Sequence, residues 1–395
     1  MSPMNWLAIL SLTAMSALTA PRAGAEPAEA PAAAWPMMRG TLAGTGRSAA
    51  RLSFPLVEVW HRSLDKTAFE ATPVIAAGTI YLGDLDGRFH AFALDTGETR
   101  WTAATNVGFP AAAAISTDAA LPLVVVGDAE GIVRAFDAAS GNVRWEYRTE
   151  AEISGGPTII ATAGGSRVLV GSQDATLSCL RLADGTVEWT HEIGDQIRCS
   201  PTVAAGVVFV AGCDGSLHVI DVVTGKETAA VPIDGPTGTT PAAHDGRIFF
   251  GTEGGIFYGI DIAPAREVWK TAAGVKGRAY RSSAAIAGDL AIVGSRGRAV
   301  EAFSRADGVQ RWRHPMRGRV DASPLVVHLE DGDREAVLVG DSAGRIVAVD
   351  AATGAPIWEF DAGGDFVGGA AVADGRIVLA SGDGTIWCFA QSPEE

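Results

Sequence analysis

The stretch AFALDTGETRW, residues 91–101, is repeated with small changes along the chain. Similar stretches are AFDAASGNVRW at 135–145, CLRLADGTVEW at 179–189 and AVDAATGAPIW at 348–358. Aligned on their last residue, the copies mark a series of positions between residues 60 and 358 that lie about 43 residues apart. A period in this range is typical of solenoids and propellers. The positions are Trp60, Trp101, Trp145, Trp189, Ala229, Trp269, Trp312 and Trp358.

Each repeat has the pattern of four short strands. In residues 200–220, the apolar runs SPTV, VVFVAG and SLHVID are separated by Ala205-Gly206 and by Asp214-Gly215. Such dipeptides favour tight hairpins. The run that ends at the aligned Trp supplies a fourth strand. Four strands and their turns fill the repeat, which therefore has the size of one propeller blade.

The count of strands predicts a closed ring. Trp60 precedes every inner strand, whereas the last inner set, residues 369–390, is followed by no fourth strand. The N-terminal strand can therefore complete the last blade and remove the open sheet edges. We predict an all-β, eight-bladed β-propeller of four-stranded blades. The inner sets begin near Thr72, Ala112, Gly156, Ser200, Thr240, Ser283, Ser323 and Gly369.

The repeated stretch has a mechanical interpretation. We expect the Asp95 carboxylate to cap the turn and Gly97 to adopt the positive φ that the turn requires. The strand that follows places Trp101 where its large apolar ring can be buried between blades. An alternative role for these tryptophans is a stacking platform for a carbohydrate or a quinone.

The AxDxxTGxxxW pattern resembles the docking motif of quinoprotein-type β-propellers, the pyrroloquinoline quinone-like and BamB-like repeat family. The resemblance covers about residues 35–390 and includes WPMMRGTLAGTGRS at 35–48. It implies one of two functions: a non-catalytic envelope scaffold that binds protein or peptide partners, or an oxidoreductase that uses pyrroloquinoline quinone with Ca²⁺. Four departures from the motif are Arg181 and Ser304 for Asp, Pro264-Ala265 for Thr-Gly, and Ala229 for Trp.

The residues favour the scaffold. The adjacent cysteines of many family dehydrogenases are absent, and no catalytic residue or metal site can be nominated. Asp84 and Asp86 suit a hairpin turn better than a calcium site. The seven histidines are not expected to cluster, although His90 and His218 hold equivalent third-strand positions.

We expect an exported protein, on the pattern of its first residues, and a monomer. Residues 1–25 have the pattern of a signal peptide, 26–34 that of a Pro/Ala-rich linker, and 35–395 form the propeller. We expect a periplasmic or secreted location. A net charge of −15 argues against nucleic-acid partners, and the mature chain has no long apolar run for membrane insertion.

The four cysteines divide into two pairs. Cys179 and Cys388 occupy one third-strand position that other repeats fill with small residues, so we expect them to be buried. Cys199 lies at the start of a first strand, and Cys213 lies at the end of the strand that forms a hairpin with it. A disulfide between them is conceivable, although the register places them diagonally.

A basic group stands out in this acidic chain. The loops VKGRAYRSS at 275–283 and PMRGRVDAS at 315–323 enter the first strands of neighbouring blades, so they are expected to lie together near the channel. Arginines that converge suit a carboxylate or phosphate. The alternative is solvated loop charges paired with nearby acids. The candidate site residues are Lys276, Arg278, Arg281, Arg317 and Arg319, with Arg198 at the position equivalent to Arg281 and with Glu70 and Asp321 at the same position in two other blades.

A third function, polysaccharide binding, depends on aromatic residues at the channel. It requires exposed rings, and the matched candidates are Phe69, Phe109, Tyr280 and Phe366.

Overall fold

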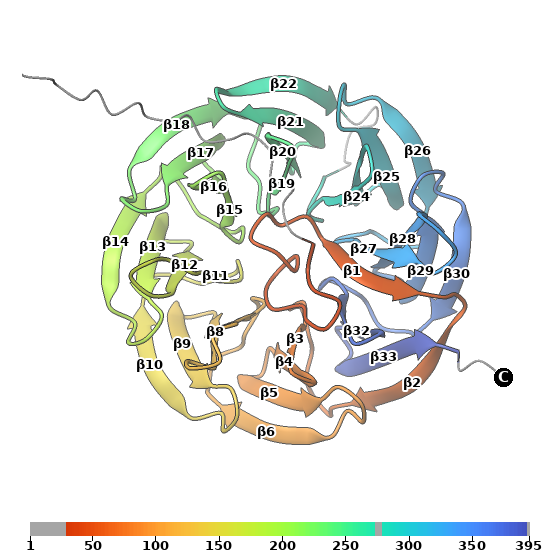
Figure 1. Cartoon of the computed structure of the whole chain (residues 1–395), viewed down its shortest axis with the longest axis horizontal. Coiled ribbons are helices and arrows are strands. Elements are labelled where there is room, and N and C mark those ends of the chain that lie inside the picture. Colours follow the sequence, from red (N-terminus) through yellow and green to blue (C-terminus); the bar gives the residue numbers. More distant parts are fainter. Residues whose placement is uncertain (1–28, 273–278, 393–395) are drawn as a thin grey trace, which may run out of the picture.

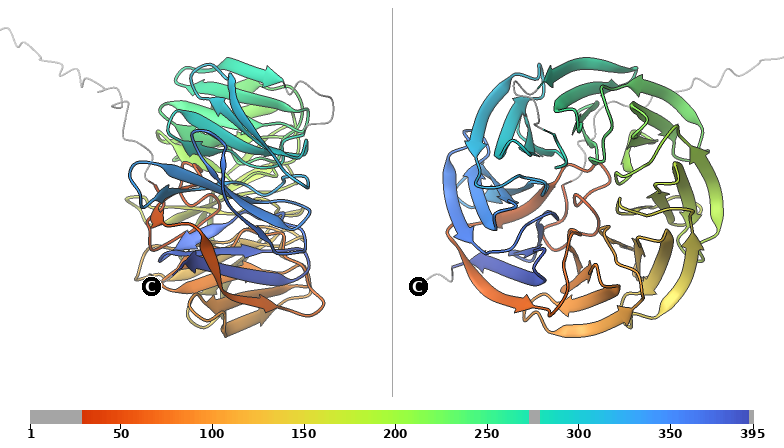
Figure 2. Two further views of the ribbon diagram at one scale, coloured as in Figure 1. Left: turned by 90° about the vertical axis from the view of Figure 1, so that its right-hand side faces the viewer. Right: turned by 180° about the vertical axis from the view of Figure 1, so that it is seen from behind.

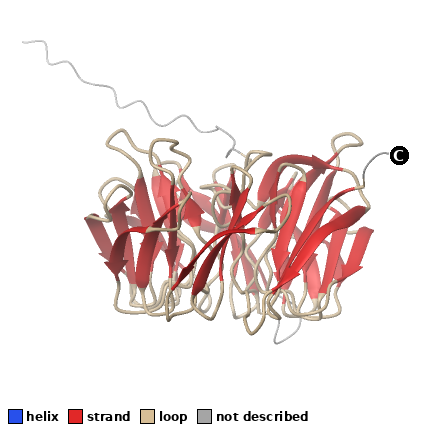
Figure 3. Cartoon of the chain, turned by 90° about the horizontal axis from the view of Figure 1, so that it is seen from below, coloured by secondary structure: helices blue, strands red, loops and turns tan. Residues whose placement is uncertain are grey.

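The computed structural model describes residues 29–272 and 279–392 (Figure 1). All regular elements in these ranges are β-strands, arranged in eight sheets around a central axis. No helix in the described ranges is long and apolar enough to cross a membrane. The signal peptide predicted over residues 1–25 lies outside the described residues. Seen from the side, the strands lie between two layers of loops (Figure 3).

The strands of blades one to four, from the channel outward, have the following bounds. Blade one contains β3 (Val74–Ala76), β4 (Thr79–Gly83), β5 (Arg88–Ala93) and β6 (Thr99–Ala104); blade two contains β7 (Ala114–Ile115), β8 (Leu123–Gly127), β9 (Ile132–Asp137) and β10 (Val143–Arg148); blade three contains β11 (Thr158–Ile160), β12 (Arg167–Gly171), β13 (Thr176–Arg181) and β14 (Val187–Glu192); blade four contains β15 (Thr202–Ala204), β16 (Val207–Ala211), β17 (Ser216–Asp221) and β18 (Glu227–Pro232).

The remaining blades follow the same order. Blade five contains β19 (Ala242–His244), β20 (Arg247–Gly251), β21 (Ile256–Ile262) and β22 (Ala265–Ala272); blade six contains β23 (Ala285–Ala287), β24 (Leu290–Ser295), β25 (Ala299–Ser304) and β26 (Gln310–Pro315); blade seven contains β27 (Leu325–Leu329), β28 (Glu335–Gly340), β29 (Arg345–Asp350) and β30 (Pro356–Asp361); blade eight contains β31 (Ala371–Ala373), β32 (Arg376–Ala380), β33 (Thr385–Gln391) and β2 (Leu56–Ser63).

The predicted eight-bladed ring and its closure are confirmed. Strand β2 pairs antiparallel with β33, from Leu56 opposite Gln391 to Ser63 opposite Thr385. The second strand of the chain therefore completes the blade that the last three strands begin (Figure 1). One feature was not predicted. The strand β1 (Arg47–Leu52) pairs in parallel with β27 and gives the seventh blade a fifth, innermost strand.

The N-terminal segment, residues 30–46, runs through the centre of the ring (Figures 1 and 2). Its backbone is hydrogen-bonded to inner strands of blades one, two and four to seven, so that the segment acts as a shared inner layer. Residues 29–34, which were predicted to be linker, take part in this packing: Ala30 is fully buried and Ala32 accepts a hydrogen bond from the Asp374 amide. The bonded pairs are Trp35 with Ile75, Pro36 with Ile115, Leu42 with Val203, Ala43 with Ala243, Thr45 with Ile286 and Gly46 with Val326.

The tryptophans dock neighbouring blades as predicted. The Trp101 ring lies on Gly141 of the next blade, where a Cβ atom would approach Cε3 to 2.6 Å, and Trp101 Nε1 donates to the Ala138 carbonyl at 3.0 Å. The glycine has φ +73°, which suits a residue without a side chain. The same contact joins Trp60 to Gly97, Trp145 to Gly185, Trp189 to Gly225, Trp269 to Gly308 and Trp312 to Gly354.

The turn cap lies two residues earlier in the motif than predicted. Asp137 Oδ1 accepts hydrogen bonds from the Ala139 and Ser140 amides. The equivalent residue of the first blade is Ala93, and Asp95 is exposed. The expected cap from Asp95 is therefore wrong in position, because the motif carries its Asp before the turn begins.

Two of the departures from the motif meet at one interface. Ala229 stands where the fourth blade lacks its Trp, and it packs in the same apolar cluster as Ile262 and Ala265 of the fifth blade. Ala265 in turn replaces the glycine on which the Trp would lie. The missing ring and the missing glycine thus compensate each other.

Candidate ligand-binding site at the channel mouth

Eight equivalent residues surround one end of the channel. Each of them precedes by two positions the residue at which the inner strands of its blade begin, as given in the sequence analysis. All eight line a single depression of about 380 Å³. Met38 of the N-terminal segment also lines this depression, so the segment forms part of its floor. The eight residues, here called the mouth ring, are Glu70, Pro110, Ser154, Arg198, Gly238, Arg281, Asp321 and Val367.

A row of hydrogen bonds supports the mouth ring in blades four to seven. The Ser200 amide donates to Thr240 Oγ1 at 3.1 Å, and the Thr240 amide donates to Ser283 Oγ at 2.9 Å. Ser283 donates to Ser323 Oγ in the same way, at 3.0 Å. These groups are buried, so the bonds satisfy backbone amides that face the channel and hold neighbouring blades in register.

One side of the mouth is acidic. Glu70 of the mouth ring and Glu152 of the loop that enters the third blade both line the depression. Burial raises the pKa of the Glu70 carboxyl above its ordinary value, and the nearby charges of Asp365 and Glu152 raise it further. Among the described residues, neither Glu70 nor Glu152 forms an ion pair. This side of the mouth therefore favours a cationic group.

The basic side is partly neutralised. Arg281 lies 3.4 Å from Glu253, and Asp321 accepts two hydrogen bonds from Arg296 at 2.8 and 2.9 Å. Arg198 differs, because within the described ranges its guanidinium contacts only the amide oxygen of Gln196, at 2.5 and 2.9 Å. Of the described cations that line the depression, Arg198 is therefore the one that can bind a carboxylate without breaking an ion pair.

The predicted basic group is only partly brought together. Arg198 and Arg281 both line the depression. Arg317 instead pairs with Asp361 at the end of an outer strand, at 2.6 Å, and Arg319 is exposed and does not line the depression. The depression is therefore lined by neither Arg317 nor Arg319. Lys276 and Arg278 lie outside the described residues.

Sequence reasoning missed the acids that complete the mouth. Glu152 precedes the equivalent mouth-ring position by two residues, and Glu253 lies in the turn between β20 and β21. Neither belongs to the repeated motif. Glu152 lies in the loop between Arg148, at the end of an outer strand, and the mouth-ring residue of the next blade. Aligning these loops from all blades would have drawn attention to it.

The four aromatic candidates for polysaccharide binding are buried wedges between blades. Phe69 and Phe109 are fully buried, and Tyr280 and Phe366 are 1% exposed. Three of the rings lie on glycines at the ends of inner strands: Phe109 on Gly83, Tyr280 on Gly251 and Phe366 on Gly340. The requirement for exposed rings at the channel is not met, and this alternative is withdrawn.

All four cysteines are free thiols. Cys179 and Cys388 are fully buried, as predicted, and burial raises the pKa of each thiol to about 12. The conceivable disulfide is not formed, since Cys199 Sγ lies near the Ala211 carbonyl and Cys213 Sγ near the Thr237 carbonyl. The two thiols thus contact different carbonyl groups and not each other.

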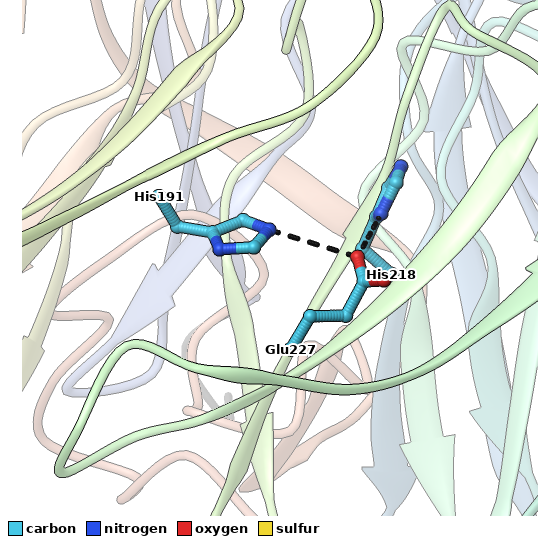
Figure 4. A group of neighbouring side chains, drawn as sticks. All are labelled: His191, His218 and Glu227. Atoms are coloured by element: carbon cyan, nitrogen blue, oxygen red, sulfur yellow. Dashed lines mark hydrogen bonds and ion pairs between the residues drawn. The ribbon is translucent and has the colours of Figure 1, made fainter.

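The histidines do cluster at one place, against expectation. His191 of blade three and His218 of blade four lie on either side of Glu227 (Figure 4). The expectation compared His90 and His218, which lie in distant blades, whereas His191 and His218 meet across the junction of two neighbouring blades. His90 instead lies between Asp84 and Thr102. Asp84 also accepts hydrogen bonds from the Asp86 and Arg88 amides, in agreement with the predicted hairpin turn.

Comparison with known proteins agrees with this architecture. A family model described as outer membrane protein assembly factor BamB matches residues 57–153, 129–228, 206–328 and 297–392. The outer membrane protein assembly factor BamB of Burkholderia pseudomallei (strain K96243) is 31% identical over 159 residues, which are 38% of this chain and 39% of that protein. The aligned part thus spans about two fifths of the curated relative.

Solved structures share the fold. BamB from Moraxella catarrhalis is 20% identical with a TM-score of 0.68, over 85% of this chain and 100% of that one. Quinohemoprotein alcohol dehydrogenase from Comamonas testosteroni is 16% identical with a TM-score of 0.72, over 92% and 82%. A europium-containing methanol dehydrogenase is 12% identical with a TM-score of 0.71, over 91% and 98%. At these identities the likeness concerns the fold alone.

Proposed function

Because this chain belongs to the outer membrane protein assembly factor BamB family, we propose that it is an exported, monomeric scaffold of the cell envelope. It binds an extended polar segment of a partner protein at the channel mouth. The dehydrogenases above share its fold at 16% identity or less, so they support no catalytic assignment. Propellers host many functions, and the site must carry the argument.

The distribution of charge at the mouth carries this proposal. Glu70 and Glu152 lack an ion pair among the described residues, and so does Arg198 across the same depression. Charged groups of both signs that line one depression without a partner cluster where a ligand compensates them. A polypeptide segment with a basic and an acidic side chain supplies both partners. A purely anionic ligand or a purely cationic ligand satisfies only one side.

The floor of the site suits a segment that enters from one face. The N-terminal segment fills the channel behind the mouth, and Met38 belongs to the lining. A ligand therefore binds in the depression and does not thread through the ring. A volume of about 380 Å³ accommodates a few side chains.

Site-specific photo-crosslinking in the native envelope tests the proposal. A photoreactive residue at Val367, in the mouth ring, should capture a partner. The matched control is Val223, which is 62% exposed in the turn between β17 and β18. Capture from Val367 that disappears in Glu70→Gln and Arg198→Gln variants supports the proposal. Equal capture from both positions contradicts it.

A small organic anion, including pyrroloquinoline quinone, is the second candidate ligand. It is favoured by Arg198 and Arg281, whose guanidinium groups can bind carboxylates in a bidentate manner. The acidic side opposes it unless Ca²⁺ is present, because Glu70 and Glu152 offer the oxygen ligands that this ion prefers. Calorimetric titration with the quinone, with and without Ca²⁺, tests this candidate. Saturable binding that is lost in Arg281→Ala favours it over the peptide, and the absence of binding removes it.

A further inference from the structure

Three metal-ligating side chains meet at the junction of the third and fourth blades. His191 lies on β14 of blade three, whereas His218 lies on β17 and Glu227 on β18 of blade four. His218 Nδ1 lies 2.6 Å from Glu227 Oε2, and His191 Nε2 lies 3.6 Å from the same oxygen (Figure 4). None of these residues belongs to the channel mouth.

The set has the composition of a zinc site. Two imidazole nitrogens and one carboxylate oxygen are ligands that Zn²⁺ binds with a fourth position left for water. One ligand atom from each residue lies within 4.8 Å of the others. Bonds of about 2.0–2.1 Å in a tetrahedral site place ligand atoms about 3.3 Å apart. Glu227 is exposed, so the solvent side of the set leaves room for its side chain to adjust to that spacing.

A second carboxylate orients the central histidine. Asp214 Oδ2 lies 2.9 Å from His218 Nε2. When Nε2 of His218 carries the proton, it donates a hydrogen bond to Asp214. The lone pair of Nδ1 is then directed towards Glu227 and His191. Metal-ligating histidines usually donate their second N–H to a carboxylate, which fixes the tautomer and the ring orientation. Asp214 is therefore a positioning residue for the site.

The burial gradient allows an ion to enter. The side chain of His218 is 8% exposed, that of His191 18% and that of Glu227 35%. A metal bound here has protein on the His218 side and solvent on the Glu227 side. The fourth position can thus be taken by water.

We propose that His191, His218 and Glu227 bind a divalent transition-metal ion of the zinc type, which clips the third blade to the fourth. The clip lies at the interface where Trp189 covers Gly225. Its ligands come from both sides of that interface, so binding stabilises the folded ring and not one blade alone.

The first blade supplies a natural control. His90 holds the strand position of His218 and also contacts an acid, Asp84, at 3.1 Å. Its other nitrogen faces the Thr102 hydroxyl, and the position equivalent to His191 is Arg62, which lies over the Phe92 ring. The first blade therefore has the pair of an acid and a histidine, but it lacks counterparts of His191 and Glu227.

Titration of the metal-free, untagged chain with Zn²⁺ by calorimetry, and with Co²⁺ by visible spectroscopy, tests the site. We expect one equivalent to bind and the melting temperature to rise in Zn²⁺. His191→Gln should weaken binding at least tenfold, and Asp214→Asn by about 10–100-fold. Among the described residues His191 contacts only Glu227 within this group, so its variant should fold normally, and a melt without metal checks this. His90→Gln should bind as the unmodified chain does.

Three results overturn the proposal. The first is no saturable binding of Zn²⁺ or Co²⁺. The second is binding that His191→Gln leaves unchanged. The third is a preference for Mg²⁺ or Ca²⁺ over Zn²⁺, because those ions favour oxygen ligands.

Discussion

The indole ring of Trp60 lies on Gly97, where a Cβ atom would approach its Cε3 atom to 2.8 Å. Trp60 stands on β2 of the eighth blade, and Gly97 lies in the turn before β6 of the first. Trp60 Nε1 also donates to the Leu94 carbonyl at 3.1 Å. The contact that docks five other pairs of neighbouring blades therefore also closes the ring.

Adding a methyl group at Gly97 should weaken this closure. Gly97→Ala meets two penalties, the positive φ of +71° and the Trp60 ring. Gly375→Ala is the matched control, since Gly375 has the same φ and nothing within 4 Å of its Cβ position. Both variants should lose about 1–2 kcal/mol from the backbone, and Gly97→Ala should lose about 1–3 kcal/mol more from overpacking. Equal losses in denaturant unfolding would contradict the docking contact.

Removing an indole should destabilise the ring strongly. Trp101→Ala deletes a ring that lies on Gly141 and near Phe136. We expect a loss of about 3–5 kcal/mol in the free energy of unfolding. Val143→Ala, a truncation at a residue that is 49% exposed on the next blade, should cost little and serves as the control. An unchanged melting temperature in Trp101→Ala would remove the mechanical role of the motif.

Neutralising Glu70 should stabilise the protein at neutral pH. Burial first, and then Asp365 and Glu152, raise the pKa of this carboxyl in the folded state. The folded protein therefore holds the proton more tightly than the unfolded chain. The free energy of unfolding consequently falls as the pH rises from the pKa of Glu70 in the unfolded chain through its pKa in the folded protein. Glu70→Gln should melt higher than the unmodified chain at pH 7, and the difference should vanish below about pH 4. A difference that is independent of pH would contradict the electrostatic cause.

The thiols should be inert in the folded protein. Burial raises the pKa of Cys179, Cys199 and Cys388 to about 12, so these thiolates are scarce at neutral pH. Burial also raises the pKa of the half-buried Cys213. A thiol reagent should label at most one cysteine before unfolding and four afterwards. Only two reactive thiols in the unfolded, unreduced chain would reveal a disulfide between Cys199 and Cys213.

The repeat made the fold predictable. The spacing from Trp60 to Trp358 and the lone N-terminal strand were enough to infer eight blades and their closure. The parallel strand over Arg47–Leu52 escaped prediction, because it lies outside the repeat and its partner β27 is about 280 residues later in the sequence. The path of residues 30–46 was hidden for the same reason.

The site was less predictable than the fold. Equivalence between blades correctly placed Arg198 and Arg281 at the channel, since both precede an innermost strand by the same interval. The same reasoning failed for Arg317, because this side chain lies in a loop and its position is set by the ion pair with Asp361. The meeting of His191 and His218 also escaped prediction, since it depends on the packing of two blades and not on a motif.

Charge reversal at the mouth ring tests the central claim most directly. The yield of partner captured from a photoreactive residue at Val367 should be measured in Glu70→Lys, in Arg198→Glu and in the unmodified chain. Each reversal replaces an attraction with a repulsion for a segment that carries both charges, so we predict at least a tenfold lower yield in both variants. An undiminished yield in both variants would show that the mouth does not recognise its partner through these charges.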